Sequence, residues 1–393
     1  MSDRPQNDAA NGSGPTSLQT RLNPIASALT GDGTPRWQRF LLLGLLALAI
    51  VLPFLVGSNR WITLMTVVVI YVVLASGLNI VVGFTGLLDL GYVAFYAIGA
   101  YYTAIIFNQV LKVRFGVDID AYWWLTWVNF LVGGLMAAIA GVLIGYPTLR
   151  VRGDYLAIMT LGFGEIIRII ANNWVGLTRG PSGIPGVPKP EFFPLGIPGI
   201  PKSVFSGFVF TSQISLYFLG LALALISLWC ISRIVRSRIG RAWTAIREDE
   251  VAAEAMGIHT SRYKLLSYAT GAFFAGAMGV FFGHYLNYIS PSSFMLMESF
   301  LILSLVVLGG MGNIAGPVLG AVIWVGLQEW LRDFPFVQAH PEVRGIALGL
   351  ILVLLMVFRP QGLLGSVRVK LEMHPQSKTE ADHERQVWSD VGN

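Results

Sequence analysis

Charged side chains are the groups in this sequence that could do chemistry, and few of them interrupt its apolar stretches. The chain has 393 residues, of which 54% are hydrophobic and only 12% are charged. Asp89, Glu165 and Arg168 lie inside long apolar segments. Because a charge in apolar surroundings is unfavourable unless it is paired, such residues indicate either a structural pair or a functional pathway.

The positions of these three residues leave two interpretations open for each. Glu165 and Arg168 are three residues apart, on one face of a helix, and are close enough to pair. The pair either neutralises itself and holds helices together or lines a translocation path. Asp89 lies among Gly83, Gly86 and Gly91, where a helix is expected to be interrupted. It either points into a binding site, as broken helices do in transporters, or caps the backbone at the turn.

Enzyme chemistry is not indicated by the remaining residues. The sequence shows no nucleophile, metal or acid–base constellation and no G-x-x-x-x-G-K-[S/T] phosphate loop. Its single cysteine, Cys230, excludes an internal disulfide. We therefore predict that the chain is not an enzyme, has no cofactor of its own, and depends on other chains for any energy from ATP.

The segments that position these residues are those of an all-α, polytopic membrane protein. A bilayer-spanning helix needs about 20 apolar residues, and the mean hydropathy of the chain is +0.64. Because the last three segments are short, we expect about ten membrane-depth helices and eight to ten spans, with 297–331 forming either two spans or a re-entrant hairpin. The expected segments are 40–57, 61–82, 87–107, 123–146, 155–175, 214–232, 265–286, 297–309, 317–331 and 344–358.

Basic residues orient this set of segments. With ten crossings, four basic clusters fall on one face of the membrane, which the positive-inside rule makes cytoplasmic. The clusters are Arg36 and Arg39, Arg150 and Arg152, the seven basic residues between Arg233 and Lys264, and Arg359, Arg368 and Lys370. We predict a multi-pass bacterial inner-membrane protein whose permease domain, 36–364, lies between disordered cytoplasmic tails at 1–35 and 365–393.

Two helices are predicted to pack through small residues. Gly133, Ala137, Gly141 and Gly145 recur at every fourth position, and Gly271, Ala275, Gly279 and Gly283 do the same. Such faces let helix backbones approach closely in lipid. The pattern leaves open whether the partner helix belongs to this chain or to another. The Pro- and Gly-rich connection 176–213 is expected on the extracytoplasmic side, as either a docking surface or a plain connector.

The basic connection 237–264 carries the clearest functional signal. It is expected to form a short amphipathic helix with Ala242, Ile246, Ala253 and either Met256 or Gly257 along one stripe. It either attaches to a cytoplasmic partner or is a solvated loop that only fixes orientation. In the first case a coupling helix lies within 237–262, and its candidate contact residues are Arg241, Arg247, Glu248, Asp249, Glu250, Ala252, Ala253 and Gly257.

Several blocks of sequence resemble a known family. Ala252-Ala253-x-x-x-Gly257 is similar to the "EAA" loop of ABC-importer permeases, although Val251 stands where that family has its leading Glu. More specific blocks resemble LivM-type permeases of the LivHM family, which serve branched-chain amino acid importers. These blocks are VGFTGLLDLGY at 82–92, AIGAY at 97–101, LRVRGDYLA at 149–157, LGFGEIIR at 161–168, GRAW at 240–243, REDE at 247–250, the stretch 306–312, and FRPQGLL at 358–364.

This resemblance implies an alternating-access importer made of several chains. The implied partners are a LivH-like second permease subunit, two LivG/LivF-like ATPase subunits that bind ATP, and an extracytoplasmic amino-acid-binding protein. The implied cargo is leucine, isoleucine and valine. Alternatives are import of urea, short amides or other amino acids by the same machine, and an ion-coupled secondary transporter that would use Glu165 or Asp89 directly.

Overall fold

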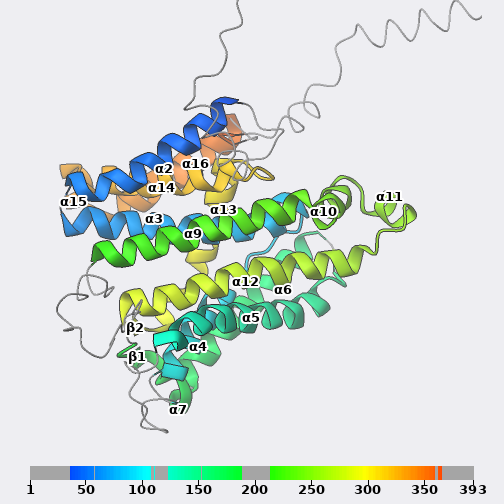
Figure 1. Ribbon diagram of the computed structural model, residues 1–393, viewed down its shortest axis with the longest axis horizontal. Coiled ribbons are helices and arrows are strands. Elements are labelled where there is room, and N and C mark those ends of the chain that lie inside the picture. The colour runs from blue at the N-terminus through cyan, green and yellow to red at the C-terminus, as the bar shows by residue number, and fades with distance from the viewer. Residues whose placement is uncertain are drawn as a thin grey trace, which may run out of the picture.

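The computed structural model describes residues 36–56, 58–107, 110, 123–151, 153–187, 213–358 and 362–364, so the tails at 1–35 and 365–393 lie outside the described residues. The described part is a bundle of roughly parallel and antiparallel helices with one two-stranded sheet (Figure 1). This confirms the predicted all-α, polytopic fold.

The helices coincide with the predicted apolar segments to within a few residues at most ends. Four of the described helices are long and apolar enough to cross a membrane: 59–84, 125–148, 213–236 and 260–286. The elements are α2 (Arg36–Val56), α3 (Asn59–Asn79), η1 (Ile80–Phe84), α4 (Val93–Ala104), α5 (Trp123–Thr148), α6 (Asp154–Asn173), α7 (Val175–Thr178), η4 (Gly180–Ser182), β1 (Ile184–Pro185), α9 (Gln213–Arg236), α10 (Arg238–Glu248), α11 (Glu250–Ala255), α12 (Thr260–Leu286), β2 (Tyr288–Ile289), η6 (Pro291–Phe294), α13 (Leu296–Gly309), α14 (Ala315–Arg332), α15 (Pro335–Ala339) and α16 (Pro341–Phe358).

The bundle has two distinct ends. At one end, on the right of Figure 1, α10 and α11 extend beyond the other helices. We call this the α10 end. At the opposite end β1 pairs antiparallel with β2 through Ile184 and Ile289, so part of the connection 176–213 is anchored there. Residues 188–212 of that connection lie outside the described residues. The turn after α5 and the start of α12 also lie at the α10 end, since Gly145 packs against Leu265.

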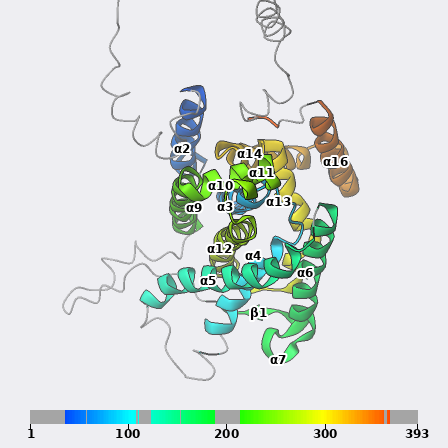
Figure 2. The same cartoon turned by 90° about the vertical axis from the view of Figure 1, so that its right-hand side faces the viewer.

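Helix α12 is the centre of the bundle, packed between α3 on one side and α4 and α5 on the other (Figure 2). Both small-residue faces are used inside this chain. Gly141 of α5 faces Ala272 and Tyr268 of α12, while Gly279 and Gly283 of α12 face α4. The partner helices left open by the sequence are therefore neighbours in the same chain, and their backbones approach closely because no side chain intervenes.

The predicted segment 87–107 is only partly helical. Residues 85–92 form a non-helical strip that is mostly buried, and α4 begins only at Val93, inside the bundle. The hydroxyl of Tyr92 donates a hydrogen bond of 2.9 Å to the carbonyl of Gly271, in the first half of α12. Non-helical backbone is tolerated at such depth where protein surrounds it, and here α3, α6 and α12 do so.

Helix α13 also begins inside the bundle. The backbone N–H of Val93, at the start of α4, donates a hydrogen bond of 3.1 Å to Oγ of Ser299, in the first turn of α13. Helix α13 then runs to the α10 end, and α14 returns from there to the far end of α3, where Glu329 meets Arg60. The turn between them, 310–314, therefore lies at the α10 end of the bundle.

Candidate functional site

The connection 237–264 forms two helices where one was predicted. Asp249, between α10 and α11, has extended backbone, and its carboxylate accepts hydrogen bonds from the backbone N–H groups of Val251 and Ala252 at 2.8 and 3.0 Å. Ser237 caps α10 in the same way through Ile239. Caps of this kind satisfy N–H groups that a helix leaves free at its start. Asp249 therefore sets the break between the two helices.

Helix α10 packs on the bundle through its apolar face. Ala242, Trp243 and Ile246 are buried, and Nε1 of Trp243 donates a hydrogen bond of 2.8 Å to the carbonyl of Tyr263 at the start of α12. Arg241 and Glu248 are exposed. The predicted stripe is confirmed for Ala242 and Ile246, and the sequence reasoning missed that Trp243 anchors α10.

Helix α11 presents a different surface. Ala253 is buried as predicted, but the side chain of Met256 is 84% exposed and Gly257 is exposed, so the stripe does not continue through them. The reason is the break at Asp249, which changes the direction of the chain. Val251 is 69% exposed and Ala252 is exposed beside it.

The base of α11 is fixed by an ion pair. Nζ of Lys264, a largely buried side chain of α12, lies 2.6 Å from Oε1 of Glu250. Gly257 has a φ of +83°, a conformation that favours glycine, at the turn that leads back to α12. An apolar tip, formed by Val251, Ala252 and Met256, is thus held at a fixed angle beyond the bundle (Figure 1).

Arg247, in the last turn of α10, points back toward the bundle. Its Nη1 donates a hydrogen bond to the carbonyl oxygen of Gly83 in η1, at the end of α3. Its side-chain stem lies close to Gly86, where the chain enters the non-helical strip, and its guanidinium reaches Gly312 in the turn between α13 and α14. Arg247 therefore touches η1, the strip before α4 and the α13–α14 turn together.

The α13–α14 turn is tied to the same place by amide side chains. Asn79 donates to the carbonyl of Asn313 at 2.9 Å and accepts from the backbone N–H of Gly312 at 3.0 Å. Asn313 donates to the carbonyl of Leu364 at 3.1 Å, and its side-chain oxygen accepts from the N–H of Ala315 at the start of α14. The end of α3, the turn and the segment 362–364 form one hydrogen-bonded junction.

Asp89 lies in the middle of the non-helical strip and is 1% exposed. Its Oδ1 accepts a hydrogen bond of 2.9 Å from the N–H of Gly91, while Thr160 of α6 accepts one of 3.0 Å from the N–H of Leu90. The hydrogen bond from the N–H of Gly91 favours the interpretation of Asp89 as a backbone cap over that of a group pointing into a binding site.

Glu165 and Arg168 pair on the surface of α6. Nε of Arg168 lies 3.0 Å from both carboxylate oxygens of Glu165. The side chains remain 35% and 31% exposed, respectively. The adjacent Gly164 packs against Gly91, so the pair lies level with the non-helical strip. The expected pairing is present, but the pair faces away from the core of this chain.

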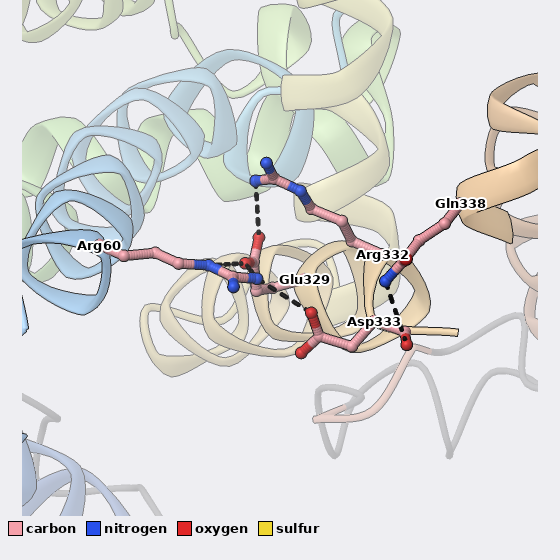
Figure 3. Close-up of polar contacts among 5 residues, drawn as sticks. All are labelled: Arg60, Glu329, Arg332, Asp333 and Gln338. Carbon is pink, nitrogen blue, oxygen red and sulfur yellow. Dashed lines mark hydrogen bonds and ion pairs between the residues drawn. The ribbon is translucent and has the colours of Figure 1, made fainter. Parts of the chain in front are cut away.

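Two further acidic residues were not singled out from the sequence because they lie near the ends of apolar segments. Glu298 accepts a hydrogen bond of 3.0 Å from Oη of Tyr71. Glu329, with a side chain only 10% exposed, pairs with Arg60, which also reaches Asp333 at 3.0 Å (Figure 3). Acidic residues near the ends of apolar segments are ordinarily expected at the membrane interface. The one signal of burial in the sequence is that Glu298 and Glu329 fall inside the predicted segments 297–309 and 317–331.

These features define a polytopic helical membrane protein with an interrupted core and a helical projection at one end. A family model described as "Branched-chain amino acid transport system / permease component" matches residues 61–356. The chain therefore belongs to this family of transport permeases, and the resemblance seen in the sequence blocks is confirmed.

Individual relatives agree with the family match. The chain is 42% identical over 352 residues to the high-affinity branched-chain amino acid transport system permease protein LivM of Escherichia coli (strain K12), covering 87% of this chain and 78% of the relative. It is 30% identical to LivH of Salmonella typhimurium, and the match covers 76% of this chain and 92% of the relative. It is 22% identical to a probable LivM of Methanocaldococcus jannaschii, and the match covers 75% of this chain and 90% of the relative. No solved structure matches the chain.

Proposed function

We propose that the chain is one of two membrane-spanning permease subunits of an ATP-binding-cassette importer for leucine, isoleucine and valine. In this proposal a LivH-like chain is the second subunit, two ATPase chains bind ATP, and an extracytoplasmic binding protein delivers the cargo. The names of the LivM and LivH relatives support the cargo and the second subunit. The absence of a phosphate loop from the sequence supports separate ATPase chains.

The observation that carries this proposal is the geometry of α10 and α11. The apolar tip at Val251, Ala252 and Met256 has no partner within the described part of the chain, and it projects from the bundle on a capped, ion-paired base. Exposed apolar groups gathered on one surface are typical of a protein–protein contact. In our proposal this tip docks into the ATPase, and Arg247 transmits its movement to α3, the strip before α4 and the α13–α14 turn.

The orientation follows from the same proposal. Basic residues gather at the α10 end, including Arg233 and Arg236 in the last turn of α9, which favours a cytoplasmic position for this end. Both termini would then be cytoplasmic, and the β1–β2 sheet would face the binding protein outside. The membrane would be the bacterial inner membrane.

Alternating access requires elements with two arrangements. Helices α4 and α13 begin inside the bundle, and the strip at 85–92 is not braced by helical hydrogen bonds. The start of this strip and the turn that follows α13 adjoin Arg247 at the α10 end. Movement of α10 after ATP binding would therefore reach the interrupted core first.

Copurification with the ATPases tests the proposal. Val251→Glu and Met256→Glu should abolish association with the ATPase subunits and ATP-driven leucine uptake, because a charge replaces an apolar contact. Phe336→Glu, on an exposed position of α15 at the opposite end, is the matched control and should leave association intact. Association unaffected by both tip variants would refute docking through α11. Uptake that survives loss of ATP but stops when ion gradients collapse would instead support a secondary transporter.

A further inference from the structure

A cavity of about 250 Å³ lies among α3, α4, α12, η6 and α13, apart from the segment that we propose docks to the ATPase. It sits at the middle of α3, between Val67 and Leu74, beside the inner end of α13. For comparison, a dry protein cavity of roughly 150 Å³ can hold a benzene molecule. The space is therefore sufficient for a small organic molecule.

The cavity has one acidic group. Oε2 of Glu298 accepts the hydrogen bond from Tyr71, which is the one hydrogen bond that the Glu298 side chain makes among the described residues. No arginine, lysine or histidine of the described part forms an ion pair with it, in contrast to Glu165, Glu250 and Glu329. A carboxylate in apolar surroundings is unfavourable without a cation or a proton. The cavity is thus suited to a ligand that brings a positive charge.

Apart from Ser293, the rest of the lining is apolar and aromatic. Val67, Ile70 and Ile302 supply branched aliphatic surface, Tyr71 bonds to the carboxylate, and Tyr96 is a second aromatic residue of the lining. An ammonium group is favoured both by a carboxylate and by the faces of aromatic rings. A branched aliphatic chain is favoured by the aliphatic wall. One small molecule that carries both groups is a branched aliphatic amino acid.

We infer that this cavity is a transient site for the cargo inside the permease, in which Glu298 binds the α-ammonium group and the wall formed by Val67, Ile70 and Ile302 receives the aliphatic side chain. This inference rests on the proposed import of branched-chain amino acids and adds a specific contact to it. The site lies where α13 and α4 begin, so movement of the interrupted core would open or close it. Tyr71 is a positioning residue that orients the carboxylate.

Photolabelling tests the site directly. The probe is a leucine analogue whose side chain carries a diazirine, added to the wild-type permease–ATPase complex without binding protein. We expect label on peptides that contain Tyr71 or Ile302, removed by excess leucine but not by 4-methylpentanoate, which lacks the amine. Label confined to other segments, or competition by both compounds alike, would overturn the inference.

Transport by variants adds a second readout. In proteoliposomes that hold the complete importer, Glu298→Gln should lower leucine uptake at least tenfold while ATPase stimulation by the loaded binding protein stays within twofold. Glu329→Gln is the control for loss of a partly buried glutamate outside the cavity, and it should leave photolabelling per assembled complex unchanged. If the wild-type importer does not take up leucine, the result counts against the proposed function. If the Glu298→Gln variant takes up leucine as fast as the wild type does, the result counts against the cavity alone. If Glu298→Gln fails to assemble, the wild-type labelling pattern decides.

Discussion

Nη1 of Arg247 donates a hydrogen bond to the carbonyl of Gly83, and this contact joins the projecting helix α10 to η1, which continues the core helix α3. The two residues are 164 positions apart in the sequence. Because η1 ends at Phe84, the helix supplies no further backbone N–H groups that could donate a hydrogen bond to the Gly83 carbonyl. A guanidinium that satisfies it stabilises the start of the non-helical strip and couples the strip to α10.

Replacement of Arg247 should uncouple ATP hydrolysis from transport. We expect Arg247→Ala to reduce leucine uptake by about tenfold, which corresponds to a loss of roughly 1.4 kcal/mol, because the charge-assisted hydrogen bond to η1 is gone. Binding-protein-stimulated ATPase activity should fall much less, since the α11 tip still docks. The measurement is the ratio of leucine transported to ATP hydrolysed in proteoliposomes.

The control for this variant is Arg241→Ala on the same helix. Arg241 is exposed, as Arg247 is, and the hydrogen bond to η1 comes from Arg247, so loss of Arg241 removes the same charge without removing that bond. Equal ratios for the two variants, or a fall in ATPase activity that matches the fall in uptake for Arg247→Ala, would contradict the transmission role.

Close packing of α4 on α12 gives a second prediction. A Cβ atom added to Gly99 would meet the carbonyl of Gly276 inside the van der Waals limit. Gly99→Ala should therefore force the two backbones apart and destabilise the protein by about 1–3 kcal/mol, seen as a lower melting temperature in detergent. Gly326→Ala is the control, because α14 has open space at that position. There alanine should be neutral or stabilising by up to ~1 kcal/mol. Equal melting temperatures for both variants would contradict this account of packing.

The sequence predicts local features of this fold better than its junctions. The length of the apolar segments located the helices, because about 20 apolar residues are needed to span a bilayer, and the spacing of Gly133 to Gly145 located a packing face. The hydrogen bond between Tyr71 and Glu298 joins residues 227 positions apart, and no local pattern indicates it. The same holds for Arg247, an exposed side chain of the predicted coupling segment whose guanidinium bonds to the Gly83 carbonyl. Its direction depends on the break at Asp249 and on how α10 docks through Trp243.

The ion pairs at the far end of α3 give a third prediction. Arg60→Gln should lower the melting temperature, on the order of 5 °C, because Glu329 is nearly buried and loses its main counter-charge. Asp333→Asn is the control, since Asp333 is 63% exposed and its pairing with Arg60 is screened by solvent. The exchange Arg60→Glu with Glu329→Arg should recover part of the loss. A larger effect of Asp333→Asn than of Arg60→Gln would contradict the assignment of Glu329 as the partner that matters.

The exposed ion pair on α6 predicts where the second permease subunit lies. Glu165 and Arg168 are about one-third exposed at the level of the non-helical strip, inside the segment predicted to be in the membrane. Charges at this depth are rarely exposed to lipid and usually face a protein interior or a water-filled cavity. We therefore expect α6 to face the other permease subunit or the path between the two subunits.

Crosslinking can test this placement. In a chain whose single cysteine is removed by Cys230→Ala, Glu165→Cys is alkylated with a maleimide that carries a benzophenone, and illumination should insert this group into C–H bonds of the second permease subunit and give a crosslinked band. Ile226→Cys on α9 is the control, since Ile226 is an exposed apolar residue on a different helix and is expected to face lipid. A crosslink from Ile226→Cys but not from Glu165→Cys would place the interface on α9. A crosslink between two copies of this chain would show a homodimer in place of the heterodimer that we propose. The two outcomes differ in band mass, so one gel distinguishes them.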